Sequence, residues 1–182
     1  MNAQSATAPI IRDAASGDFD AIARIYAHYV DHALATFEEV PPSPDEMRSR
    51  QAAIVAAGLP YLVAEIDGEV AGYAYASAYR ARSAYRHTIE DSIYIAEGFH
   101  GRGLGYTLLS ALIDRCEAGP WRQMVAVIGN SGNAASIALH TRLGFGHVGV
   151  LRDVGFKHGR WVDSVLMQRA LDASAPVIDG KS

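Results

Sequence analysis

Residues 92–106 read SIYIAEGFHGRGLGY, and this stretch decides the fold. Its first residues favour a β-strand, and the leucine-rich segment that follows residue 103 favours a helix. Glycines at such a junction let backbone N–H groups approach an anion, and the helix N-terminus adds the positive end of its dipole. The spacing matches neither the P-loop nor the dinucleotide-binding motif. On spacing alone, an anion-binding loop and a plain glycine-rich turn are equal alternatives.

The rest of the chain alternates between helical and strand patterns. Helices are expected from Asp18 through a stripe that ends at Val30, from Ser43 or Asp45 to Gly58, from Gly103 to Ala118, and from Asn133 to Leu143, with Gly144 as C-cap. Strands are expected at 10–11, 61–64, 70–79, 87–95, 124–128, 147–154 and 161–167, with hairpin turns at Asp67-Gly68 and His158-Gly159. The apolar run 124–128 predicts a strand buried on both faces. Together these elements predict an α+β fold in which helices cover a mixed sheet.

Length and composition restrict the class of protein. A chain of 182 residues with 49% hydrophobic residues predicts one globular domain, over residues 8–171, with flexible termini at 1–7 and 172–182. The net charge of −4 argues against nucleic acid as a partner. A single cysteine, no signal peptide and no apolar run long enough to cross a bilayer favour a cytoplasmic protein that does not contact a membrane.

Several short segments, in order along the chain, resemble one family. The glycine loop after Ile93-Tyr94-Ile95 is similar to the pyrophosphate loop of the GCN5-related N-acetyltransferases (GNAT), and residues 133–145 are similar to their next helix. Residues 36–38, 79–85, 90–92, 154–161 and 167–168 narrow the resemblance to the branch that acetylates phosphinothricin, methionine sulfoximine and methionine sulfone. This resemblance implies the GNAT fold, a mixed sheet of about seven strands flanked by about four helices.

The resemblance also implies acetyl-CoA as cosubstrate, without a metal. In such folds the strand that holds Ile93 splays from its neighbour, and its backbone binds the pantetheine and the thioester carbonyl, where it forms an oxyanion hole. The loop N–H groups hold the pyrophosphate. The residues expected to bind the cofactor are Ile93, Tyr94, Ile95, Gly101, Arg102, Gly103, Leu104, Gly105, Tyr106 and Asn133. His100 stands where the family usually has glutamine or arginine, which predicts altered CoA affinity, and Arg102 is a candidate for the missing charge.

Glu90 is the expected catalytic base. An α-amine is mostly protonated at neutral pH and cannot attack a thioester until a base removes a proton. A partly buried carboxylate with a raised pKa suits that task. Glu90 directly precedes the thioester-binding segment, where the resembled branch has its base. Without the resemblance, an exposed carboxylate at a sheet edge is the simpler interpretation.

His140 is the second expected catalytic residue. The wider superfamily usually has a tyrosine at this helix position, which protonates the departing thiolate, whereas the resembled branch has histidine. General acid toward sulfur and second base are both open roles for His140. A structural histidine is the alternative, because a lone histidine on a helix is more often structural.

The acceptor is expected to be a small amino-acid analogue. Guanidinium groups suit a carboxylate, so Arg80 and Arg82, with the hydroxyl of Tyr85, are expected to bind the acceptor's carboxylate. Phe37 is expected to meet its oxidised side chain. Two other functions stay open: acetylation of another amine, such as a peptide N-terminus, a polyamine or an ordinary amino acid, and a non-catalytic CoA sensor.

Three further features of the sequence have no expected catalytic role. His28 and His32 have helical spacing for a metal, but Tyr29 stands where a metalloprotease motif has glutamate. Cys116 falls on a leucine stripe and is expected in the core. Trp161 and Phe156 are expected in the core or at an interface. The resembled branch has a two-fold contact in this region, which implies a homodimer.

Overall fold

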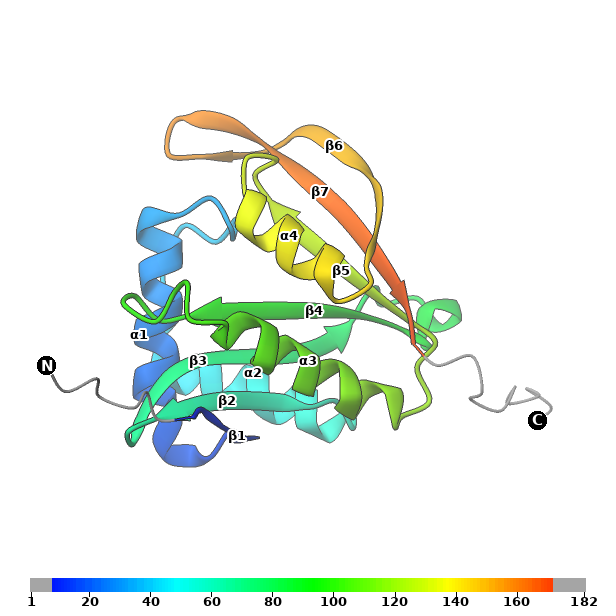
Figure 1. Ribbon diagram of the computed structural model, residues 1–182. Helices are drawn as coiled ribbons and strands as arrows, with labels where there is room; N and C mark the ends of the chain where they lie inside the picture. The colour runs from blue at the N-terminus through cyan, green and yellow to red at the C-terminus, as the bar shows by residue number, and fades with distance from the viewer. Residues whose placement is uncertain (1–7, 172–182) are drawn as a thin grey trace, which may run out of the picture.

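One seven-stranded sheet organises the fold, in the order β1-β2-β3-β4-β5-β7-β6. It is seen in a computed structural model, which describes residues 8–171 (Figure 1). The strands are β1 (Ile10–Asp13), β2 (Tyr61–Ile66), β3 (Glu69–Ala78), β4 (Thr88–Ile95), β5 (Gln123–Gly129), β6 (Gly146–Lys157) and β7 (Arg160–Ala170). All neighbours pair antiparallel except β4 and β5, which are parallel. The predicted mixed sheet and α+β class are confirmed. The termini expected to be flexible lie outside the described residues.

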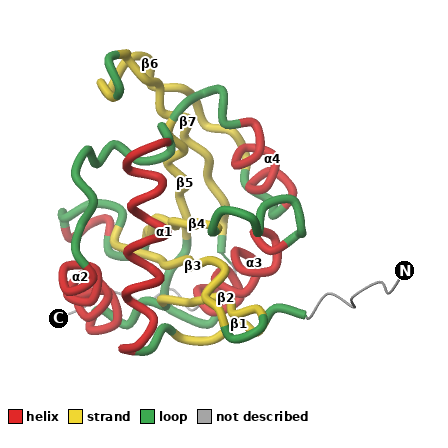
Figure 2. Tube along the Cα trace, turned by 90° about the vertical axis from the view of Figure 1, so that its left-hand side faces the viewer, coloured by secondary structure: helices red, strands yellow, loops and turns green. Residues whose placement is uncertain are grey.

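Helices cover both faces of the sheet. Helices α1 (Phe19–His32) and α2 (Pro44–Ala56) lie on one face, and α3 (Leu104–Glu117) and α4 (Ala134–Arg142) lie on the other (Figure 2). Each side has its own apolar cluster, one built around α3 and the other around α1. Cys116 is fully buried in the first cluster, as its place on the leucine stripe predicts. Within residues 8–171, no helix is long and apolar enough to span a membrane.

The tight turns follow the residue types that the sequence offers. Asp67-Gly68 and His158-Gly159 have positive φ at both positions, the conformation that two-residue hairpin turns require. Ser43 caps α2 by accepting a hydrogen bond from the Glu46 N–H, and Gly144 ends α4 with φ of 84°.

Two local expectations need correction. Asp18 is the N-cap residue of α1, as expected, but its side chain makes no capping hydrogen bond. Instead its carboxylate accepts hydrogen bonds from the Arg12 guanidinium at 2.7 and 2.9 Å, because a short 3₁₀ turn over Ser16–Asp18 turns it toward β1. The strand β5 is not buried on both faces either. Val127 is 39% exposed, because β5 separates from β4 at this level and leaves one of its faces open.

Candidate active site

The separation of two parallel strands creates the site. β4 and β5 pair only through Thr88–Asp91 and Gln123–Ala126, and beyond those residues no pairing joins them. The backbone of β4 continues to bond to β3 on its other side, and Ala96 N–H still donates to Ala71. Because bonding directions alternate along an antiparallel pair, the N–H and C=O of Ile93 point away from β3, into the gap. The gap therefore exposes backbone hydrogen-bonding groups, as the expected splay requires.

Tyr29 of α1 holds the open end of β4. Its hydroxyl donates to the Ile95 carbonyl at 2.9 Å and accepts from the Ile95 N–H at 3.2 Å. These two groups belong to the side of β4 that has lost its strand partner, so one hydroxyl satisfies both. A side chain, instead of a neighbouring strand, thus binds the backbone of β4 at this edge of the gap.

The glycine loop ends at the uncapped start of α3. Gly101 and Gly103 have φ of 75° and 78°, in the left-handed region that favours glycine. Gly103 is the N-cap residue of α3, and no side chain caps the helix there. The first backbone N–H groups of the helix are consequently available to a ligand, and the dipole makes this end attractive to an anion.

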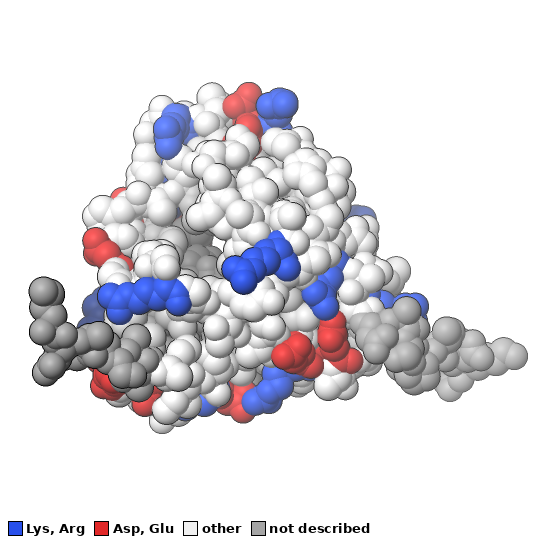
Figure 3. Space-filling model, in the orientation of Figure 1, with Lys and Arg blue, Asp and Glu red and all other residues white. Residues whose placement is uncertain are grey.

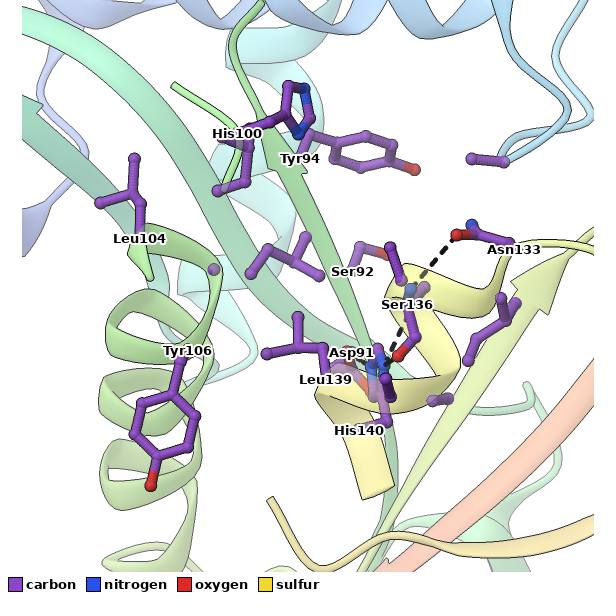
Figure 4. Close-up of a pocket in the computed structure, with 18 of the residues that line it drawn as sticks. Asp91, Ser92, Tyr94, His100, Leu104, Tyr106, Asn133, Ser136, Leu139 and His140 are labelled. Carbon is purple, nitrogen blue, oxygen red and sulfur yellow. Dashed lines mark hydrogen bonds and ion pairs between the residues drawn. The ribbon is translucent and has the colours of Figure 1, made fainter. Parts of the chain in front are cut away.

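A cavity of about 480 Å³ joins the gap to the loop (Figure 4). Of the ten residues expected to bind the cofactor, nine line it: Ile93, Tyr94, Ile95, Gly101, Gly103, Leu104, Gly105, Tyr106 and Asn133. Arg102 does not line it, and its guanidinium lies over the Phe99 ring. His100 is part of the lining. Asn133 also caps α4 by accepting a hydrogen bond from the Ser136 N–H at 3.2 Å.

Arg142 is a cation of this cavity that the sequence reasoning missed. It lies at the end of α4, lines the cavity and stacks over the Tyr106 ring at 4.5 Å. The space-filling view shows a hollow in this face with Lys or Arg side chains beside it (Figure 3). An arginine near the loop's N–H groups suits a phosphate-bearing ligand.

Glu90 faces a second cavity, of about 230 Å³, on the α1 side of the sheet. Phe37 and Thr36, from the loop after α1, also line it. Ser92 and Tyr94 line both cavities, so the two meet at the open part of β4. The structure thus brings Glu90 and Phe37 together beside the gap.

The Glu90 carboxyl has the pKa of a neutral-pH base. Burial and the neighbouring Asp91 raise its pKa to about 7, and the charge of Arg80 opposes that rise. Burial disfavours the ionised carboxylate, which makes it a better proton acceptor once it is ionised. A group with a pKa near the ambient pH is suited to take a proton and release it again.

His140 and Asp91 form a buried pair on the opposite face of the sheet (Figure 4). His140 is 2% exposed and Asp91 is 6% exposed. The His140 Nε2 lies 3.0 Å from the Asp91 Oδ2, and its Nδ1 lies 2.7 Å from the Ser136 carbonyl oxygen. Adjacent strand residues face opposite ways, so Glu90 and Asp91 occupy different cavities.

Both ring nitrogens of His140 face acceptors, which decides its protonation. A carbonyl oxygen can only accept a hydrogen bond, so Nδ1 carries a proton, and an ionised carboxylate likewise requires a proton on Nε2. Burial lowers the pKa of His140, but the hydrogen bond and charge of Asp91 outweigh it, so the pKa is raised. The geometry therefore favours the imidazolium form.

The arginine loop lies outside both cavities. Arg80, Arg82 and Tyr85 are exposed, and none of them lines a cavity wall. The Arg80 guanidinium stacks on Tyr79 at 5.0 Å, and its charge acts on Glu90. Binding of an acceptor carboxylate by these three residues stays a prediction.

Comparison with known proteins places these features in one family. Residues 23–145 match the model described as the acetyltransferase (GNAT) family. The chain belongs to the GNAT acetyltransferase family. GNAT relatives include a phosphinothricin N-acetyltransferase of Alcaligenes faecalis, 59% identical over 92% of this chain and 83% of that protein. Another is an L-methionine sulfoximine/L-methionine sulfone acetyltransferase of Pseudomonas aeruginosa, 44% identical over 91% of this chain and 98% of that protein.

A solved GNAT structure extends the similarity to three dimensions. A phosphinothricin acetyltransferase from Sinorhizobium meliloti, in complex with AcCoA, superimposes with a TM-score of 0.87. It is 48% identical, over 91% of this chain and 89% of that one. The GNAT fold that the resemblance implies is therefore confirmed. In the described part of this GNAT chain, no group of three or more His, Cys, Asp or Glu residues is placed to hold a metal.

Proposed function

We propose that this protein transfers the acetyl group of acetyl-CoA to the α-amine of a small amino-acid analogue of the phosphinothricin, methionine sulfoximine or methionine sulfone type. The relatives named above act on these compounds. The observation that carries the proposal is the meeting of the two cavities at Ser92 and Tyr94, with Glu90 on the acceptor side. A carboxylate with a pKa of about 7 at that junction suits deprotonation of an amine.

The cofactor side of the site fits acetyl-CoA. The free N–H groups at the start of α3 and the left-handed Gly101 and Gly103 suit a pyrophosphate. The unpaired backbone of Ile93 suits the amide-bearing pantetheine, and its N–H suits a thioester oxygen that gains negative charge. The side chain of Asn133 is committed to the α4 N-terminus, so its role is to fix the wall of the cavity.

The chemistry divides between the two faces of the sheet. On one face, Glu90 accepts a proton from the acceptor's ammonium group, which frees the nitrogen lone pair to attack the thioester carbon. The carbonyl π electrons move to oxygen, and they return to expel the CoA thiolate, while the nitrogen loses its second proton to water and the thiolate takes one up. On the other face, His140 has no lone pair free to take a proton while Asp91 and Ser136 hold it. Both ring N–H groups are engaged by these two acceptors, so the geometry favours His140 as a fixed positive charge that stabilises the thiolate over a second base.

The pH dependence of turnover should report the state of Glu90. Because the base must be ionised, kcat/KM is expected to fall below an apparent pKa of about 7, approaching a tenfold loss per pH unit. The measurement is kcat/KM for methionine sulfone from pH 5.5 to 9 at saturating acetyl-CoA. The Glu90→Gln variant should lose this limb. If the limb persists in that variant, it belongs to another group.

The acceptor class is tested by release of CoA thiol with a panel of amines. It contains methionine sulfone, methionine sulfoximine, phosphinothricin, ordinary amino acids, a polyamine and a short peptide. Turnover concentrated on the first three supports the proposal. Acceptors without a carboxylate are the second candidate class, because Arg82 and Tyr85 lie outside the cavity walls. Turnover of the peptide or polyamine alone would favour that class, and CoA binding without turnover would favour a sensor.

The exposed face of the last hairpin suits a second copy of this chain. Val148, Leu151, Val154, Phe156 and Trp161 on β6 and β7 are all exposed, and Trp161 is 64% exposed. These apolar side chains lie on two neighbouring strands, and such clustering on a surface is typical of protein interfaces. We include in the proposal a cytoplasmic homodimer that forms through this face. Light scattering should give twice the chain mass for the wild type, and Trp161→Glu should give monomers; a monomeric wild type would contradict the dimer.

A further inference from the structure

Lys157 is a buried cation that the proposed chemistry does not use. It is the last residue of β6 and is only 1% exposed. Lysine is almost never fully buried without a partner, because removing an ammonium group from water is costly. Among the residues described, no carboxylate lies within salt-bridge distance of its Nζ. A cation held in this way calls for an explanation.

The partners of Lys157 are two backbone carbonyls on the acceptor side of the molecule. Its Nζ donates to the Thr36 oxygen at 2.9 Å and to the Tyr29 oxygen at 3.4 Å. Tyr29 lies in the last turn of α1, where a cation also meets the negative end of the helix dipole. Thr36 lies in the loop after α1 and lines the cavity of Glu90. One side chain from β6 thus ties this loop to the end of α1.

A second residue of β6 touches the same loop. A Cβ on Gly155 would lie 2.7–2.9 Å from the ring atoms of Phe37, so the ring rests directly on the Gly155 backbone. Phe37 lines the Glu90 cavity as well. From the other side, the Tyr26 hydroxyl bonds the Thr36 hydroxyl at 2.7 Å. The Lys157 ammonium group and the Tyr26 hydroxyl therefore hold Thr36, and the Gly155 backbone supports the ring of Phe37.

We propose that Lys157 and Gly155 are positioning residues that set the acceptor-binding wall formed by Thr36 and Phe37, and thereby determine which acceptor is used. Neither residue lines the cavity, so both act through the loop. Without the ammonium group, the Thr36 carbonyl loses its donor and the loop gains freedom. This inference rests on the proposed function for its kinetic consequence, whereas its structural consequence can be measured without turnover.

The test compares Lys157→Met with the wild type. Methionine keeps a long apolar side chain and removes the charge. The KM for methionine sulfone is expected to rise at least tenfold, with the KM for acetyl-CoA changing less than twofold. The preference for methionine sulfone over unoxidised methionine should also fall. Arg160→Met is the matched control, because it removes an exposed cation from the strand residue opposite Lys157, and it should change neither value.

Two further measurements keep the proposal open to refutation. Amide hydrogen exchange over residues 33–43 should be faster in Lys157→Met, whether or not the panel contains the true acceptor. Gly155→Ala, which displaces the Phe37 ring, should also raise the KM for the acceptor. This variant tests the proposal if Lys157→Met does not fold. Unchanged exchange and an unchanged acceptor KM would overturn the proposal, as would an equal rise in both KM values. If the wild type acetylated no amine in the panel, the proposed function would be refuted. Amide hydrogen exchange in Lys157→Met would still test the role of Lys157.

Discussion

The Glu90→Gln variant is expected to lose about 10²- to 10⁴-fold in kcat at neutral pH, because the amide cannot take a proton from the acceptor. Glutamine has nearly the same shape, so the walls of both cavities should keep their geometry. Glu90 lines only the acceptor cavity, and the KM for acetyl-CoA should therefore change less than about threefold. Steady-state kinetics at pH 7.5 with methionine sulfone give both parameters.

Glu90→Gln should also make the protein more stable at alkaline pH. The folded state raises the pKa of Glu90 from 4.5 to about 7, so folding is opposed by this group once the pH rises through that interval. The variant is free of this penalty, and above pH 7 its free energy of unfolding should exceed the wild-type value by about 1–3 kcal/mol. Unfolding in urea at pH 5 and pH 8 measures the difference. Unchanged turnover in Glu90→Gln would remove Glu90 from the mechanism. If the variant and the wild type were equally stable at both pH values, the raised pKa of Glu90 would be contradicted.

The Asp91→Ala variant is expected to lose about 3–5 kcal/mol of stability, because it leaves the buried His140 without its charge partner. The two groups lie 3.0 Å apart and are both nearly inaccessible to water. His140 has a raised pKa, so the pair contributes in full below the unfolded histidine value of about 6.5 and less as the pH rises through the folded value. The loss of stability should accordingly be larger at pH 6 than at pH 9, as measured by urea unfolding.

Controls separate this pair from general effects of losing a carboxylate. Asp114→Ala removes an exposed carboxylate from α3 and should change stability by less than about 0.5 kcal/mol. Nitrogen NMR of the wild-type His140 ring should detect protons on both Nδ1 and Nε2 at pH 7, and Asp91→Asn should lose the Nε2 proton. A neutral His140 in the wild type, with Asp91→Ala as stable as the control, would show that the pair is not ionic.

Most of the fold follows from local sequence patterns. The glycine loop after residues 93–95 predicts the junction of β4 and α3, because glycines with positive φ and an uncapped helix leave a recognisable pattern. The Asp-Gly and His-Gly turns predict their hairpins for the same conformational reason. β4 and β5, which α3 connects, pair in parallel, as strands joined through a helix usually do. These features depend on residues close together in the sequence.

The contacts that complete the site depend on distant residues and leave little trace in the sequence. Asp91 and His140 are 49 positions apart, and only strand alternation hints that Asp91 faces away from Glu90. A lysine just before a hairpin turn is usually solvated, so nothing in the pattern predicts that Lys157 is buried beneath a loop 121 residues earlier. Val127 was expected to be buried because its neighbours are apolar, and it is exposed because two strands separate there. Such outcomes are set by how the elements pack.

The most direct test of the account is identification of the product formed from acetyl-CoA and methionine sulfone by the wild-type protein. Mass spectrometry and NMR should detect N-acetylmethionine sulfone, with the acetyl group on the α-nitrogen and one CoA thiol released for each product molecule. No product should form when the acceptor is left out or when Glu90→Gln replaces the wild type on the same time scale. Release of CoA thiol without an acetylated acceptor, or an equal rate with Glu90→Gln, would contradict base-assisted transfer at this site.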